Sequence, residues 1–531
     1  MQQYYPSAPP DYPGAPPAYG QATGSFPASL TAVGLQAVDF LPLMTAEDGP
    51  SDRPEYERFN ILVERANHFL RDNPHCTVNT CESVEFSVCD GGWEIDTVQS
   101  VFVAYGDSNN RYIRGLRLWI QPRSTSAAVS QFEPDQIGYV NFLPDIQRDD
   151  APQRLDIVLE RINRTQIKGR IITVETQPIK WGNSALDPDR TIWTERGMAR
   201  DRFINLVRIF YIRGAVEHLQ VGLEDFVPAV LEKATASSNP RMETFPMVMQ
   251  RVQKWLLSVP PHFRPVNVQT VMFRWSYNKG IDTKDMTYHE NKTLLNYLRF
   301  LRVAYVIENP DSGPVSRSTI QLGSKLMVPE MIQQPVFLDQ EAVAKLRQAA
   351  HDAAAASKTA AFESRNASIK SGETDLISLE AALKSQESAF TMQQVALKAQ
   401  EAAFRLQESV TRSQKGEFET QESCRRRLDA WLKTTGAGVV SVETLVMRIV
   451  GGGESVYGFD AMHTWNEMHL SLSGTRNLTK RDDERFALMY RIYTDEIVPE
   501  PGGTVAKSRL ENFTIYSGSG ERDYAKFSHK S

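Results

Sequence analysis

Four side chains near position 80 are of the kinds that bind zinc. His75, Cys76, Cys81 and Cys89 fall within one short stretch, and imidazole and thiolate groups are the usual ligands of structural zinc. Structural sites, however, usually bring their ligands in closely spaced pairs, and these cysteines are not spaced in that way. We therefore interpret them as ordinary buried thiols and predict neither a metal site nor a cofactor.

Common sequence signatures of catalysis are missing. The sequence contains no G-x-x-x-x-G-K-[ST] phosphate loop, no H-E-x-x-H zinc motif and no G-x-S-x-G nucleophile elbow. The glycines of GGGESVYG, which starts at residue 451, lack the lysine of a phosphate loop and predict a flexible connection. Arg425, Arg426 and Arg427 could meet a phosphate, but near the end of a helix they are expected to remain solvated. We predict no catalytic residue and no enzymatic activity.

The strongest motifs lie in the segment YPSAPPDYPGAPPAYG, residues 5–20. Such a proline-rich backbone prefers the extended polyproline conformation, so binding imposes little further order, and aromatic grooves can bind its rings. The partner-binding candidates are a PSAP motif formed by Pro6, Ser7, Ala8 and Pro9, a PPxY motif formed by Pro9, Pro10, Asp11 and Tyr12, and a second PPxY motif formed by Pro16, Pro17, Ala18 and Tyr19.

This combination of motifs resembles the late-budding segments of viral matrix and Gag proteins. In those families P-[ST]-A-P recruits the ubiquitin-variant domain of the ESCRT-I complex, and PPxY recruits WW domains of HECT-type ubiquitin ligases. The resemblance covers about the first twenty residues. The remaining chain departs from Gag because it has no zinc-knuckle spacing, and from small matrix proteins in its length and its lack of a basic face.

Length, composition and charge restrict the class of protein. The 531 residues, of which 41% are hydrophobic and 23% charged, are enough for several buried cores. The formal net charge of -6 does not indicate a nucleic-acid coat or a polybasic membrane surface. We expect no transmembrane segment and no signal peptide, and four cysteines suit a reducing compartment. The expected location is the cytosol.

Composition and periodicity predict a multidomain α+β protein. Residues 1–50 are expected to form a disordered proline-rich docking tail. The alternation of Val84, Phe86 and Val88 predicts strands and a mainly antiparallel β domain over residues 51–195. A helical domain is expected over 196–335, a long helix or coiled-coil region over 336–435, and a mixed α+β region over 436–531.

The helical domain is predicted from a period of 3.6 residues. Phe203, Leu206, Val207 and Phe210 fall at helical spacing after Asp201, which is a candidate N-cap. The segments FPMVMQRVQKWLL, from residue 245, and KTLLNYLRFLRVAY, from residue 292, show the same spacing and predict two further helices.

A glutamine recurs at every seventh position of the segment that follows, from Gln386 to Gln421. An alanine column and a column of larger residues flank it, and such a surface can pair with a second helix through interhelical hydrogen bonds. Alternatively, the glutamines face water and the larger residues cover the protein's own core. The helix can be one rod or a hairpin. The candidate self-association residues are Leu383, Phe390, Leu397 and Phe404.

The leading functional hypothesis is a viral structural protein, namely a capsid, outer-shell or matrix-like virion component. It would self-assemble as a homo-oligomer in the host cytoplasm and recruit host ESCRT-I and WW-domain ubiquitin ligases for viral egress. The alternative is a cellular endosomal or ubiquitin-ligase adaptor that uses the same motifs to sort cargo. An enzyme with an unrecognised site is a further, weaker alternative.

Overall fold

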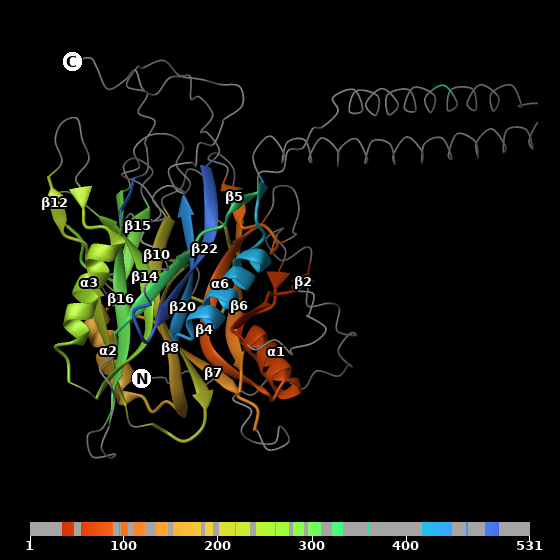
Figure 1. The fold of residues 1–531 in the computed structure, drawn as a ribbon, viewed down its shortest axis with the longest axis horizontal. Coiled ribbons are helices and arrows are strands. Elements are labelled where there is room, and N and C mark those ends of the chain that lie inside the picture. Colours follow the sequence, from red (N-terminus) through yellow and green to blue (C-terminus); the bar gives the residue numbers. More distant parts are fainter. Residues whose placement is uncertain are drawn as a thin grey trace, which may run out of the picture. The chain divides into compact units, whose positions relative to one another are not determined.

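The computed structural model shows a strand-rich α+β protein (Figure 1). The residues that it describes are 34–46, 55–88, 95, 97–104, 111–123, 133–146, 152–181, 186–194, 201–217, 219–233, 241–260, 262–275, 280–290, 296–308, 321–332, 359, 417–448, 463–465 and 484–498.

The chain divides into two compact units. The first comprises Met1–Pro329, Thr420–Val450 and Glu454–Val505. The second comprises Glu330–Glu419, Gly451–Gly453 and Ala506–Ser531. The described residues of the second unit are few, and Met331–Ile332 and Glu417–Phe418 among them form one short hairpin, so the architecture below is that of the first unit.

One structural motif occurs four times in the first unit. Each repeat contains a short outer strand, a helix, and a hairpin of two long strands. Repeat 1 consists of β1 (Gln36–Phe40), α1 (Phe59–Asp72), β4 (Cys76–Ser87) and β6 (Arg111–Pro122). Repeat 2 consists of β7 (Ile137–Phe142), α2 (Leu155–Arg164), β8 (Gly169–Trp181) and β10 (Asp201–Arg213). Repeat 3 consists of β11 (Gln220–Phe226), α3 (Phe245–Leu256), β14 (Phe263–Trp275) and β16 (Asn296–Ile307). Repeat 4 consists of β17 (Gly323–Met327), α6 (Gln421–Thr435), β20 (Val439–Arg448) and β22 (Glu484–Thr494).

The second long strand is central in every sheet. It pairs antiparallel with the first long strand on one side and with the short outer strand on the other, as in the order β1-β6-β4. The same pairing is found for β10, β16 and β22. The first long strands, β4, β8, β14 and β20, are called the inner strands below.

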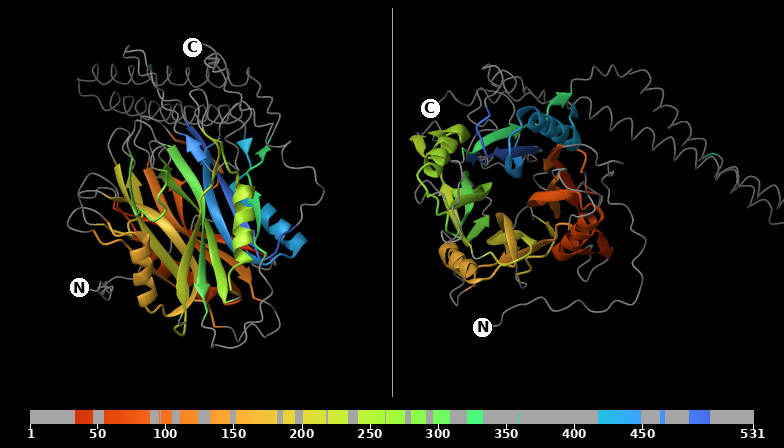
Figure 2. Two further views of the ribbon diagram at one scale, coloured as in Figure 1. Left: turned by 90° about the vertical axis from the view of Figure 1, so that its left-hand side faces the viewer. Right: turned by 60° about the horizontal axis from the view of Figure 1, so that its bottom comes forward.

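Each sheet also receives a short strand from the next repeat. β9 (Ile192–Thr194) of repeat 2 pairs with β6, β15 (Thr287–Glu290) of repeat 3 pairs with β10, and β21 (His463–Trp465) of repeat 4 pairs with β16. β5 (Val101–Ala104) of repeat 1 pairs with β22 of repeat 4. The last pairing joins the two ends of the series, so the four repeats form a closed ring (Figure 2).

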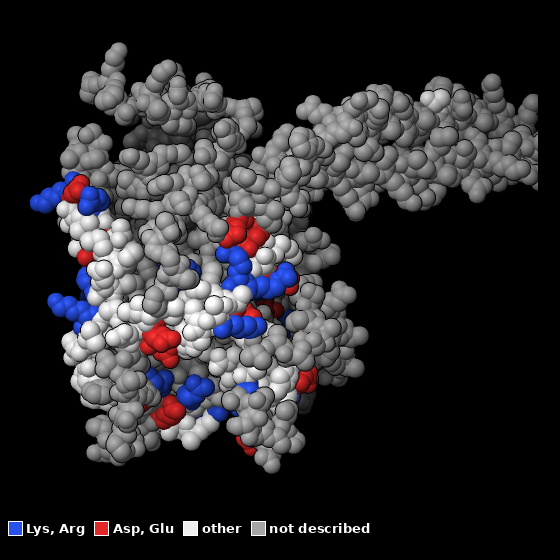
Figure 3. Space-filling model, viewed as in Figure 1, with Lys and Arg blue, Asp and Glu red and all other residues white. Residues whose placement is uncertain are grey.

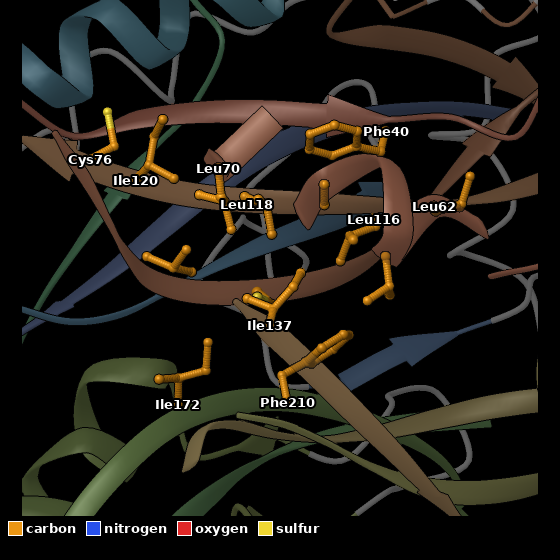
Figure 4. Close-up of a cluster of buried hydrophobic side chains, with 14 of the residues drawn as sticks. Phe40, Leu62, Leu70, Cys76, Leu116, Leu118, Ile120, Ile137, Ile172 and Phe210 are labelled. Atoms are coloured by element: carbon orange, nitrogen blue, oxygen red, sulfur yellow. The ribbon is translucent and has the colours of Figure 1, made fainter. Parts of the chain in front are cut away.

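The helices pack between successive sheets. Leu62 and Leu70 of α1 belong to one buried cluster with Leu118 of their own sheet and with Ile172 and Phe210 of repeat 2 (Figure 4). The clusters around α2, α3 and α6 likewise combine residues of two neighbouring repeats. Burial of this apolar surface holds each repeat against the next.

A small hairpin lies before each helix in the chain. It is formed by β2 (Met44–Ala46) with β3 (Glu55–Tyr56), by the bridge between Ile146 and Pro152, by β12 (Val230–Glu232) with β13 (Arg241–Met242), and by β18 (Met331–Ile332) with β19 (Glu417–Phe418). In the sequence, the two sides of each hairpin are separated by residues 47–54, 147–151, 233–240 and 333–416. The predicted heptad segment is therefore an insertion in the sequence between β18 and β19.

The predicted helical domain over residues 196–335 is wrong in most of its elements. Asp201 begins strand β10 and is not a helix N-cap, and the segment from Asn296 to Ile307 is strand β16. The helix expected from residue 245 is confirmed as α3. Both faces of β10 are buried, because Phe203, Leu206, Val207 and Phe210 all lie inside. Such a strand has no solvent-exposed face, so its apolar residues do not alternate with polar ones and can imitate a helical spacing.

The predicted boundaries at residues 335 and 435 are also wrong. Repeat 4 begins with β17 and continues in α6 and β20, so its parts flank the insertion in the sequence. Gln421, the last member of the glutamine column, is buried at the first position of α6. Leu383, Phe390, Leu397 and Phe404 lie outside the described residues.

The insertion should be dispensable for folding of the ring. We expect a variant in which residues 333–416 are replaced by the tip sequence of residues 147–151 to keep its melting temperature within about 4 °C, because the hairpin is closed by its own strands. Differential scanning calorimetry measures this temperature. Loss of cooperative unfolding in the variant would contradict the modular arrangement.

Candidate functional site

The inner strands present an edge that has no backbone partner in a sheet. Each inner strand pairs through its backbone with the second long strand of its own repeat, and its other edge faces the inner strand of the next repeat. Buried N–H groups at such an edge cost free energy unless an acceptor reaches them.

Acidic and amide side chains of the next repeat supply the acceptors. The carboxylate of Glu175 accepts a hydrogen bond from the backbone N–H of Ser83 at 3.0 Å. The side chain of Gln269 accepts from Thr176 N at 2.8 Å, and that of Glu443 from Thr270 N at 2.5 Å. Glu82 of repeat 1 accepts from Thr444 N of repeat 4 at 2.5 Å. These hydrogen bonds therefore also link repeat 4 to repeat 1, as the pairing of β5 with β22 does.

A second set of acceptors lies two residues earlier on the inner strands. Thr173 Oγ1 accepts from the backbone N–H of Cys81 at 3.1 Å, Asn267 Oδ1 accepts from Val174 N at 2.8 Å, and Ser441 Oγ accepts from Val268 N at 3.2 Å. The residues involved form four related quartets in the sequence, TCES from 80, TVET from 173, NVQT from 267 and SVET from 441.

One buried arginine of each repeat adds a further bond across the same interface. These four central arginines are Arg117, Arg208, Arg302 and Arg491. The Nη1 atom of each donates to a hydroxyl of the preceding repeat, namely Thr444 at 2.9 Å, Ser83 at 2.8 Å, Thr176 at 2.8 Å and Thr270 at 3.0 Å, respectively.

The short outer strands bind the other edge of three of these guanidinium groups, those of Arg117, Arg208 and Arg302. Asp39 lies opposite Arg117 in the sheet register and accepts two hydrogen bonds from it, at 2.6 and 2.8 Å. Asp225 binds Arg302 with the same two distances. Asn141 accepts from Nε of Arg208 at 2.8 Å. Bidentate pairs of this kind combine charge with a fixed geometry.

Burial gives the acidic members of the site unusual protonation behaviour. Burial raises the pKa of Glu82 to about 7, although Arg117 and donors from Trp119 and Thr444 oppose the shift. Burial also raises the pKa of Glu175, partly offset by Arg208. At Asp39 burial acts in the same direction, but the charges of Arg117 and Arg425 outweigh it and lower the pKa.

These side chains connect neighbouring repeats. Each acid or amide of the quartets accepts hydrogen bonds from the neighbouring backbone, and Gln269 does so without a charge. The shared property of the four side chains is therefore hydrogen-bond acceptance at the edge of an inner strand. It joins repeats that would otherwise expose unsatisfied strand edges.

The structure describes only some of the residues that the sequence analysis singled out as candidate sites. The tail residues, from Pro6 to Tyr19, lie outside the described residues, as does Cys89. Cys76, Cys81 and Cys424 are buried and form no disulfide. In the part of the chain that the structure describes, no group of His, Cys, Asp or Glu side chains could hold a metal ion.

Two of the three consecutive arginines are not solvated as expected. Arg425 forms an ion pair with Asp39 at 3.2 Å, and Arg427 donates to the carbonyl of Val328 at 2.6 Å. Arg426 is exposed. They lie in the first half of α6 rather than near its end, so they do not complement the helix dipole.

The surface of the described residues carries charges of both signs. On the face shown in Figure 3, Lys and Arg side chains lie beside Asp and Glu side chains. None of the described helices is long and apolar enough to cross a membrane.

No protein-family model, curated protein or solved structure matches the chain. Its geometry defines it as a ring of four strand–helix–hairpin repeats, closed by strand exchange and by a recurring set of buried side-chain bonds.

Glu82 should make the stability of the ring depend on pH. Its pKa rises from 4.5 to about 7 on folding, so the folded state favours the protonated form. The contribution of Glu82 to stability is therefore greatest below pH 4.5. As the pH rises from 4.5 to about 7 this contribution is lost, and the free energy of unfolding falls by about 3 kcal/mol. In Glu82→Gln this decrease should disappear from urea unfolding curves recorded across that range.

The matched control is Glu422→Gln in α6, because the Glu422 side chain is 68% exposed. This control should keep the pH dependence of the wild type. A Glu82→Gln variant with an unchanged pH dependence would show that Glu82 remains ionised in the folded protein.

Proposed function

We propose that this chain is a non-enzymatic viral structural protein that self-assembles and recruits host ESCRT-I and WW-domain ubiquitin ligases for particle egress. The observation that carries the proposal is the PSAP motif, its overlap with one PPxY motif and the second PPxY motif, all within residues 5–20. Each motif alone is short, but their combination is typical of late-budding segments.

The ring supports a scaffolding role. Its buried acids and arginines hold neighbouring repeats together, which is the use expected of them in a structural protein. The tail precedes the ring in the sequence, and residues 333–416 are inserted in the sequence between β18 and β19. Both segments can therefore present binding motifs without contributing to the sheets of the ring.

The tail should bind two classes of host domain. A peptide of residues 1–25 is expected to bind an ESCRT-I ubiquitin-variant domain and WW domains with dissociation constants of about tens of micromolar for one motif, because each motif buries little area. Isothermal titration calorimetry measures both. Pro6→Ala should impair only the first interaction, because Pro6 belongs to PSAP alone.

Tandem WW domains distinguish one PPxY motif from two. Tyr19→Ala should weaken binding less than the double change of Tyr12 and Tyr19, because either motif can hold the partner while the other rebinds. None of these changes should alter the melting temperature of the ring. If the variant with Pro6, Tyr12 and Tyr19 all replaced still binds, the motifs are accidents of composition.

The insertion should drive self-association or close an internal antiparallel hairpin. Leu397→Asp combined with Phe404→Asp places two charges in the column of larger residues beside the glutamines, so pairing of this surface should be lost. Sedimentation velocity of the full chain measures the oligomer. If assembly and protease resistance stay unchanged, the glutamine-flanked surface has no role in association.

The same assembly experiment separates the proposal from its alternative. A cellular endosomal or ubiquitin-ligase adaptor would use the same tail motifs, but regular shells or sheets in electron micrographs would be unexpected of it.

A further inference from the structure

Two interfaces of the ring contain a matched pair of buried arginines. At the interface of repeats 1 and 2 the pair is Arg114 and Arg208, and at the interface of repeats 3 and 4 it is Arg299 and Arg491. Within each pair one arginine precedes the central arginine of its own repeat by three positions, and the other is the central arginine of the next repeat.

The aromatic contacts confirm that these interfaces correspond. The guanidinium carbon of Arg208 lies 3.8 Å from the ring centroid of Phe59, and that of Arg491 lies 3.7 Å from the centroid of Phe245. Phe59 and Phe245 are the first residues of α1 and α3. The two pairs therefore occupy equivalent positions and can be compared group by group.

Acidic side chains surround the first pair. Arg114 lies opposite Glu85 in the register and forms an ion pair with it at 2.6 Å. Glu175 and Asp189 act on Arg208 with their negative charges, and Asp189 lies 4.0 Å from it. Three carboxylates thus face two guanidinium groups.

The second pair has less compensation within the described residues. Met272 lies opposite Arg299, where Glu85 lies opposite Arg114. Leu326 lies opposite Arg491, where the other outer strands carry Asp or Asn. Glu443 is the carboxylate that reaches Arg491, at 3.3 Å, and it also accepts bonds from Thr270 and Tyr493.

The consequence is an excess of positive charge at the second pair, because within the described residues Glu443 is the one carboxylate beside its two buried guanidinium groups. In other respects the two pairs are alike. Nε of Arg114 and Nε of Arg491 are both buried without a hydrogen-bond partner, and burial lowers the pKa of both Arg208 and Arg299 to about 10. Buried cations without a counter-charge are costly, whereas guanidinium groups bind oxyanions with strong, charge-assisted hydrogen bonds.

We propose that Arg299 and Arg491 form a binding site for a small oxyanion of the phosphate class at the interface of repeats 3 and 4. The anion takes the place of Glu85 and Asp189, the two carboxylates of the first pair that have no counterpart here, since Glu443 corresponds to Glu175. Met272, beside Arg299, is 48% exposed, so solvent reaches this part of the interface. Occupancy of the site joins two repeats and stabilises the ring.

The test is the thermal stability of the full chain in inorganic phosphate. At constant ionic strength, phosphate and sulfate should raise the melting temperature in a saturable manner and chloride should not. Isothermal titration calorimetry gives the phosphate affinity of the wild type directly. An equal response to chloride, or no response to any anion, would overturn the proposal.

Met272→Glu is the decisive variant, because it restores the carboxylate found at Glu85 and replaces an exposed side chain. It should raise the melting temperature in the absence of phosphate and abolish the phosphate response. Val446→Glu is the matched control, since Val446 is 40% exposed and lies opposite Leu488 rather than an arginine. The control should keep the phosphate response, and Met272→Glu with an unaltered response would exclude the site.

Arg299→Met provides an independent measurement. Loss of one charge-assisted contact should weaken phosphate binding by about tenfold or more. If phosphate binds this variant as it binds the wild type, the anion lies elsewhere.

Discussion

The ring depends on satisfying the free edges of four inner strands. A sheet edge in a protein interior normally pairs with another strand or meets water. Here the neighbouring inner strand is close, but the hydrogen bonds come from its side chains, through Glu82, Glu175, Gln269 and Glu443. The spacing of the four sheets and the position of the central arginines follow from this arrangement.

These side-chain hydrogen bonds place polar groups in the interior, at positions where most protein cores contain apolar side chains. Arg117 and Arg208 have fully buried side chains, yet each donates to both neighbouring elements. Buried ion pairs add little net stability compared with well-packed apolar groups, but they impose a defined geometry. The apolar clusters around the helices supply the burial, and the arginines set the register between repeats.

Parts of this architecture could be predicted from the sequence. Alternating residues such as Val84 and Phe86 identified β4, and the period of residues 245–256 identified α3. The sequence predicts helices in place of β10 and β16, because both faces of these strands are buried and the alternation of apolar and polar residues is lost. The boundary of repeat 4 was missed because an insertion separates β17 from α6 in the sequence.

The fourfold repeat has only a weak sequence signal. The quartets TCES, TVET, NVQT and SVET share a hydrogen-bond acceptor at the third position and a hydroxyl at the fourth. The residue itself varies, however: the third position is Glu or Gln, and the fourth is Ser or Thr. What is kept is the ability to accept a hydrogen bond, and four-residue similarities of this kind also arise by chance. The arginine pairs were likewise out of reach, since their charge balance depends on residues opposite them in the sheet register.

The strand exchange makes the starting point of the chain immaterial to the ring. Repeats 4 and 1 are joined by the β5–β22 pairing and by the bond from Thr444 to Glu82, the same kinds of contact that join repeats consecutive in the sequence. Any connection between repeats is thus topologically equivalent to the gap between the last repeat and the first. The fold is in this sense circularly permutable, and the order in which the repeats leave the ribosome need not be the order in which they close.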